Sequence, residues 1–199
     1  MASFIFGIDV SGNPYQTTYV SLASFNVNNY GRIMKDLRHN FPNTRKGSDL
    51  NDQRLKNIIK FLDKNGIKMV SICFSNADWN YYKEKYGQHG NFKENIFGVI
   101  YFVLLQEVSN QKYRYRVTVD KENFMNIEKV IETCRKLAKS NDYFFDLSIG
   151  HSRTDELIKI ADYIASSHRK INHEDLKFFR NLKIISSELP GKYLTKVFR

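Results

Sequence analysis

Runs of apolar residues, separated by turn residues, divide the chain into short strands. The β-rich runs 4–10 and 17–25 are joined by a Ser-Gly-Asn-Pro turn, which predicts an antiparallel hairpin. From 113 to 120, Tyr and Val alternate with Arg, Thr and Asp, the two-residue period of a strand with one buried face. The apolar runs 67–74 and 143–149 also predict strands. The pattern therefore predicts five strands.

Helical spacing of apolar residues predicts the elements between these strands. The predicted helices cover about 49–65, 91–108 and 124–137, and a fourth follows Thr154. In the first of them, apolar residues recur every three or four positions until Gly66 ends the helix. The segment 28–46 is ambiguous. Strands and helices thus alternate along most of the chain.

This order of elements resembles that of a ribonuclease H-like core. In such a core, three antiparallel strands are followed by alternating helices and strands, which add two parallel strands on the other side of the first. We therefore expect an α/β fold with a mixed five-stranded sheet, in the order 3-2-1-4-5, flanked by helices.

Length and charge limit the possible organisation and partners. The 199 residues are predicted to form a single ribonuclease H-like domain, 1–199, with an inserted helix near 49–65 and a basic C-terminal extension at 169–199. An apolar content of 42% is that of a folded globular protein. The 31 basic and 21 acidic residues give a formal charge of +10, which favours anionic partners such as nucleic acid. The extension carries half of this net charge.

The cysteines and the N-terminal residues predict a cytoplasmic protein. Cys73 and Cys134 have no Cys or His at metal-ligand spacing, so both are expected to be buried and reduced. Met1 leads directly into a strand, without the basic segment of a signal peptide. The apolar run 96–105 is far shorter than the ~20 residues that cross a bilayer, so it predicts a core helix and no membrane partner.

Three aspartates stand where carboxylates can converge. Asp9 closes the first strand and Asp120 closes the fourth, and these strands would be neighbours about 4.8 Å apart. Asp162 lies at the edge of the apolar face of the last helix, where Ala161 and Ala165 allow close approach to the sheet. Such carboxylates are costly to bury unless something positive pairs with them, and a divalent cation would do so.

Four stretches resemble the ribonuclease H-like family catalogued as domain of unknown function 3800. They are Phe-Gly-Ile-Asp-Val-Ser-Gly at 6–12, Arg-Lys-Gly-Ser-Asp-Leu at 45–50, Asp120 at a strand end, and Ile-Ala-Asp-Tyr-Ile-Ala at 160–165. The resemblance covers roughly 4–168. It implies a fold similar to ribonuclease H and RuvC-type resolvases, Mg²⁺ or Mn²⁺ held by carboxylates, and phosphodiester cleavage. By this resemblance the catalytic residues and metal ligands would be Asp9, Asp120 and Asp162.

A fourth acidic ligand is not fixed by the sequence. Members of the family often carry a glutamate just before the Lys-Gly-Ser stretch, where this chain has Thr44 and Arg45. Glu94 and Asp146 are therefore the candidates for a further metal ligand. Glu94 could instead complete a capping box with Asn91, and Asp146 could be a polar strand residue.

Basic and aromatic residues suggest how a nucleic acid would bind. The candidate phosphate-binding residues are Arg114 and Arg116 on the fourth strand, and Arg153, Arg169 and Lys170 around the last helix. The aromatic segment 79–86 could stack on unpaired bases or fold back onto the core. His151 could assist proton transfer or be an ordinary loop residue.

The sequence favours a metal-dependent nuclease that hydrolyses phosphodiester bonds in DNA or RNA, with Mg²⁺ or Mn²⁺ as cofactor. The alternative is a non-catalytic nucleic-acid or protein-binding module on the same fold. A phosphate-binding P-loop is excluded because Asn13 and Pro14 stand where Lys and Ser or Thr are required. The chain also lacks a Gly-x-Ser-x-Gly motif and a zinc-binding cluster.

Overall fold

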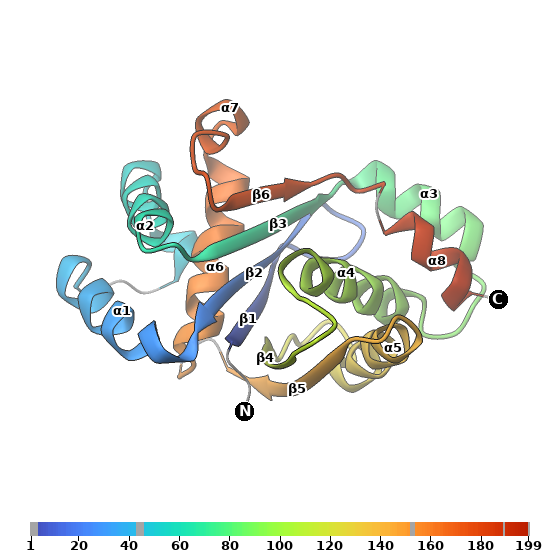
Figure 1. The fold of residues 1–199 in the computed structure, drawn as a ribbon. Coiled ribbons are helices and arrows are strands. Elements are labelled where there is room, and N and C mark those ends of the chain that lie inside the picture. The colour runs from blue at the N-terminus through green and yellow to red at the C-terminus, as the bar shows by residue number, and fades with distance from the viewer. Residues whose placement is uncertain (1–3, 43–45, 152–153, 189, 199) are drawn as a thin grey trace.

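Figure 1 shows the computed structural model of the protein, which describes residues 4–42, 46–151, 154–188 and 190–198. A six-stranded sheet runs through the molecule in the order β5-β4-β1-β2-β3-β6. Its strands are β1 (Phe4–Ser11), β2 (Thr18–Asn26), β3 (Lys68–Phe74), β4 (Arg114–Asp120), β5 (Phe144–Gly150) and β6 (Leu182–Ile185).

The pairing of the strands confirms the predicted order 3-2-1-4-5. β1 pairs antiparallel with β2 and β2 with β3, whereas β4 lies parallel to β1 and β5 parallel to β4. β6 adds a sixth strand, parallel to β3, at the other edge. β6 comes from the segment 169–199, which was predicted as a basic extension. This segment is part of the folded domain, because Ile185, Tyr193 and Leu194 are buried in the core.

Helices cover both faces of the sheet (Figure 1). On one face lie α3 (Asn76–Tyr86), α4 (Phe92–Val108), α5 (Ile127–Ser140) and α8 (Gly191–Val197). On the other lie α1 (Val27–Asn40), α2 (Asp52–Lys64) and α6 (Glu156–Lys170), with the short helices η1 (Gly47–Asp49) and α7 (His173–Leu176). Much of the ambiguous segment 28–46 thus belongs to α1, whose residues Ile33, Met34 and Leu37 are buried.

The apolar run in α4 is a core helix, as predicted. All residues from 96 to 105 are buried between the sheet and the surrounding helices. In the described part of the chain, no helix is long and apolar enough to cross a membrane. The predicted capping box is wrong, because Asn91 has left-handed backbone angles (φ 56°, ψ 33°) and its side chain makes no capping bond.

The aromatic segment 79–86 lies within α3 and packs against the core. Trp79 is fully buried, and Tyr82 and Tyr86 are also buried. Their rings contact Phe74, Phe97 and Phe198, so they present no free face to a base, whereas Tyr81 is exposed. Trp79, Tyr82 and Tyr86 therefore fold back onto the core and do not form a stacking surface for bases.

A buried polar row fastens α6 to the sheet. Ser21 Oγ lies 2.6 Å from Ser71 Oγ, which lies 2.8 Å from His168 Nδ1 on α6. His168 also meets the ring of Tyr19 edge-on. Burial, aided by the charge of His173, lowers the pKa of His168 from 6.5 to about 4.

We expect His168 to make the protein less stable in mild acid. Between pH 6.5 and 4 the unfolded chain binds a proton at this position and the folded chain does not, so the free energy of unfolding falls as pH decreases. The full effect is about 3 kcal/mol, at 1.36 kcal/mol for each pKa unit. Urea unfolding at pH 7.5 and 4.5 checks this: His168→Gln should lose less stability than the wild type over this interval, and equal losses would contradict the assignment.

Candidate metal centre

Two aspartates meet at the carboxyl ends of β1 and β4. The strands pair in parallel with Ile8 beside Val119, so the next residues, Asp9 and Asp120, are also neighbours. Ile8 is buried on the α4 face of the sheet, and side chains alternate along a strand. Asp9 and Asp120 therefore both lie on the face that α6 covers.

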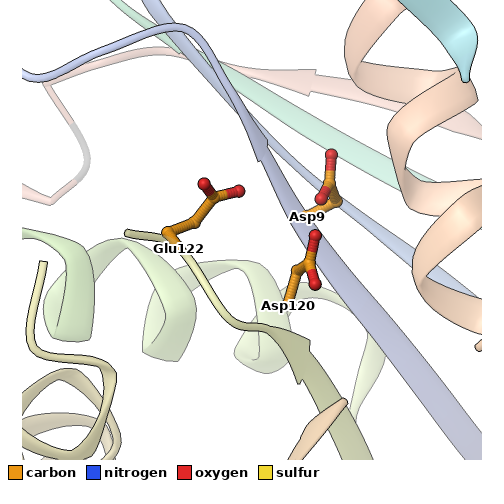
Figure 2. Close-up of side chains that lie close together, drawn as sticks. All are labelled: Asp9, Asp120 and Glu122. Carbon is orange, nitrogen blue, oxygen red and sulfur yellow. The ribbon is translucent and has the colours of Figure 1, made fainter. Parts of the chain in front are cut away.

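A third carboxylate, Glu122, joins them from the chain that follows β4 (Figure 2). One carboxylate oxygen from each of Asp9, Asp120 and Glu122 lies within 4.8 Å of the other two. Asp9 and Asp120 are only 4% and 8% exposed. Oxygen donors at this spacing suit a hard divalent cation such as Mg²⁺ or Mn²⁺.

The cluster is electrostatically unfavourable when all its members are ionised. Burial raises the pKa of Asp9 well above its usual value, and the charges of Asp162, Glu122 and Asp120 raise it further. Burial and the charge of Asp120 raise the pKa of Glu122 to about 7, although Lys46 lowers it. A cation among these oxygens would remove the repulsion, so the donor set fits a metal ion.

Asp162 faces the cluster from α6. It lines the same cleft as Asp9 and Asp120. Among the neighbouring charges, that of Asp162 makes the largest contribution to the raised pKa of Asp9. Its own pKa is raised by burial, but the Gly47 backbone N–H donates a hydrogen bond of 2.7 Å to its Oδ2. Ser166 Oγ donates a longer bond of 3.4 Å to Oδ1. Asp162 thus lies beside the three clustered carboxylates with its orientation fixed by protein donors.

The short helix η1 holds Asp162 because it is itself fastened to α6. Lys170 Nζ donates hydrogen bonds of 2.7 Å and 2.8 Å to the carbonyl oxygens of Ser48 and Leu50. A Cβ atom on Gly47 would lie 2.6 Å from Ser166 Oγ and 2.8 Å from the carbonyl oxygen of Asp162. Only glycine permits this close approach, which also places Lys46 at the rim of the cleft.

We expect Gly47→Ala to displace η1 and to free Asp162. The added methyl group forces a shift of backbone atoms, which costs about 1–3 kcal/mol in the free energy of unfolding. Gly90→Ala is the matched control, because a Cβ at Gly90 meets nothing within 4 Å. Urea denaturation measures both variants, and equal midpoints would show that η1 does not pack on α6 as described.

The cleft around the carboxylates has a volume of about 1060 Å³. Besides the acids, its lining includes Lys46, Lys121 and His151. All three are exposed and lie in the same cleft as the carboxylates. His151 therefore lies at the cleft, where a role in proton transfer requires it to be.

The structure places the two further candidate ligands elsewhere. The carboxylate of Glu94 on α4 accepts a hydrogen bond of 3.2 Å from the backbone N–H of Asn126, and it lies outside the three-carboxylate cluster. Asp146 pairs in register with Arg116 on β4, four residues before Asp120, or about 13 Å along the strand. Glu94 and Asp146 are therefore not brought to the cluster.

Glu122 is the acidic residue that the sequence reasoning missed. It follows the end of β4 by two positions, so strand alternation does not determine where its side chain points. The available signal was the pattern Asp120-Lys121-Glu122, which places two acids close together after a buried strand. Such a pattern at the carboxyl end of a parallel strand is worth testing as a ligand pair.

The predicted phosphate-binding residues lie in different places. Arg114 and Arg116 are exposed on β4, on the same face as Asp120 but toward the other end of the strand. Arg169 is exposed and close enough to lower the pKa of Asp162. Lys170 is engaged with the carbonyl oxygens that hold η1, so its role in the structure is to fix that helix. Arg153 lies outside the described residues.

The fold is similar to that of solved ribonucleases H. Ribonuclease H2 from Pyrococcus horikoshii OT3 superposes with a TM-score of 0.59 at 13% identity, over 89% of this chain and 78% of the other. A chain of the PCNA:RNase HII complex from Archaeoglobus fulgidus gives 0.56 at 14% identity, over 98% and 87%. Bst-RNase HIII in complex with Mn²⁺ gives 0.54 at 13% identity, over 88% and 54%.

Comparison of the sequence alone adds no relative. No family model matches the chain, so the resemblance to the family of domain of unknown function 3800 stays a prediction. No curated protein matches it either. The strand order, the helices on both faces and the superpositions together show that this chain has an α/β fold of the ribonuclease H type.

Proposed function

We propose that this protein is a metal-dependent nuclease that hydrolyses phosphodiester bonds in DNA or RNA. Asp9, Asp120 and Glu122 would hold a divalent cation, Mg²⁺ or Mn²⁺, and Asp162 would complete the site from α6. The observation that carries the proposal is the convergence of three carboxylates, two of them buried, within 4.8 Å of one another. Repulsion of this kind persists in a folded protein when function requires it.

The arrangement of the residues suits phosphodiester chemistry. A divalent ion in such a site supplies Lewis-acid catalysis for the hydrolysis of phosphate esters. Lys46 and Lys121 line the cleft and would attract the phosphate toward the carboxylates. His151 lies at the same cleft, where it could accept or donate a proton at the substrate.

Two independent features support this function over a role for the cluster in stability alone. The fold is shared with ribonucleases H, and the structure of Bst-RNase HIII was solved in complex with Mn²⁺. The raised pKa values of Asp9, Glu122 and Asp162 mean that the ionised cluster destabilises the metal-free fold.

A cleavage assay with labelled oligonucleotides tests the proposal. Single-stranded RNA, single-stranded DNA, both duplexes and the RNA–DNA hybrid are incubated with the protein and Mg²⁺ or Mn²⁺. We expect cleavage of at least one substrate, loss of cleavage with EDTA, and its return when excess metal is added. Glu94→Gln is the matched control, because this buried glutamate lies outside the cluster and should leave metal-dependent cleavage in place.

Absence of cleavage of all these substrates with both metals would contradict the proposed activity. Binding of the same oligonucleotides without cleavage would instead favour a non-catalytic nucleic-acid-binding module on this fold.

A further inference from the structure

A second large cleft, of about 980 Å³, lies at the ends of β4 and β5 that are remote from the carboxylates. It is lined by the first residues of both strands and by the last turns of α5. Asp120 lies six residues beyond Arg114 on β4, which corresponds to about 20 Å along the strand. The cleft is therefore a separate feature of the surface, joined to the metal centre by one strand.

The lining of this cleft is strongly basic. Lys112, Arg114, Arg116 and Lys139 line it and are exposed, and among the described residues none of them forms an ion pair. One acidic residue, Asp146, stands among the described lining residues. Unpaired cations gathered in a concave surface attract a polyanion.

Two aromatic rings are exposed beside these cations. Tyr113 is 50% exposed and Phe144 is 56% exposed, although both belong to residue types that fold into cores. Their neighbours Tyr143 and Phe145 pack against each other with ring centroids 5.6 Å apart and against the core. Phe144 alternates with these two rings along β5, so it lies on the opposite face of the sheet, the face of its partner Arg114, where its ring is open to stacking.

One face of β4 leads from the cleft toward the metal centre. Arg114, Arg116, Thr118 and Asp120 alternate on one face of β4, at steps of about 7 Å. Asp146 and Ser148, on the same face of the neighbouring strand β5, are exposed. The exposed part of this face ends before Asp120, because the start of α6 packs there: a Cβ on Gly150, the β5 partner of Asp120, would lie 2.8 Å from Ile158 Cδ1 and 3.2 Å from Asp155 Oδ2.

We propose that this cleft binds a single-stranded segment of nucleic acid. Arg114 and Arg116 would contact its phosphates, and Phe144 and Tyr113 would stack on unpaired bases. The proposal rests on the proposed function for the class of ligand, a nucleic acid, but the binding itself requires no metal.

The exposed rings favour a single strand over a duplex. Proteins that bind single strands combine a positive groove with aromatic side chains on which successive bases stack. Bases inside a duplex are stacked on one another and are not accessible to Phe144 or Tyr113. A duplex would therefore gain the phosphate contacts but not the stacking.

Fluorescence anisotropy of labelled oligonucleotides in EDTA tests the cleft without cleavage. We expect Arg114→Ala/Arg116→Ala to weaken binding of single strands about tenfold or more, and to reduce the slope of log K against log salt by about 1.4. We expect Phe144→Ala to weaken binding of single strands about tenfold and to leave duplex binding unchanged.

The matched control removes two exposed lysines elsewhere, in Lys60→Ala/Lys64→Ala on α2. This variant should bind single strands nearly as the wild type does. The proposal is overturned if the arginine variant retains wild-type affinity, if the lysine variant loses as much, or if Phe144→Ala weakens duplex binding equally. If the arginine variant loses binding and the wild type cleaves no substrate, the proposed nuclease activity is contradicted but the proposed binding in the cleft is supported.

Discussion

Replacing Asp9 by Asn is expected to abolish metal-dependent cleavage and, at the same time, to stabilise the metal-free protein. Asp9 is one of the three clustered carboxylates, so its loss removes a proposed metal ligand. Loss of a residue that only supports a ligand typically costs 10–100-fold in activity, so we expect more than about a hundredfold for a ligand itself. The rate of oligonucleotide cleavage measures this effect.

The gain in stability has a defined dependence on pH. The folded-state pKa of Asp9 is raised by burial and by Asp162, Glu122 and Asp120, so the wild type loses stability as pH rises above the usual pKa of an aspartate. Asn cannot ionise, and Asp9→Asn should therefore be more stable than the wild type in EDTA, by at least about 1 kcal/mol, or about 2–4 °C in Tm, at pH 8. The difference should shrink toward pH 4.

Excess Mn²⁺ should reverse the order, because the metal stabilises only the protein that binds it. Ser148→Ala provides a control on the same face of the sheet, outside the cluster. If the Asp9→Asn variant cleaves like the wild type, Asp9 is not part of the site. If this variant is less stable than the wild type in EDTA at pH 8, the electrostatic argument is contradicted.

Gly7→Ala is expected to cause the largest loss of stability. Gly7 lies on β1, where α6 passes directly over the strand, and a Cβ there would overlap the backbone carbonyl group of Leu157. Backbone atoms of a packed helix cannot move aside as a flexible side chain does, so we expect a cost of at least about 3 kcal/mol. The same shift would move Asp162 away from Asp9.

Urea denaturation and metal-dependent cleavage together measure this effect. Gly31→Ala on α1 is the control, because a Cβ at Gly31 meets nothing within 4 Å and alanine favours a helix. It should be slightly more stable than the wild type. A Gly7→Ala protein with an unchanged urea midpoint would show that α6 does not lie this close to β1.

The parts of the fold that follow from period and register could be predicted from the sequence. Alternation predicted the buried face of β4, and the order of elements predicted its parallel pairing with β1, which places Asp9 beside Asp120. β6 was missed because its four residues are too short to show a period and lie among basic residues. Its place in the sheet depends on contacts with β3, which no local pattern reveals.

The fourth acid could not be predicted for a similar reason. Glu94 and Asp146 were candidates because they lie on a predicted helix and a predicted strand, whereas Glu122 follows a strand end, where no period applies. Its position depends on the path of the chain after β4. The hydrogen bond from Gly47 to Asp162 also joins residues 115 positions apart, so only the folded chain shows that η1 orients this carboxylate.

Calorimetric titration with Mn²⁺ tests the central claim most directly, because it asks whether the clustered carboxylates hold a divalent ion. Wild-type protein should show saturable binding, and an Asp120→Asn/Glu122→Gln double variant, folded by circular dichroism, should show only the heat of dilution. Equal binding by the two proteins, or no binding by the wild type, would contradict the account.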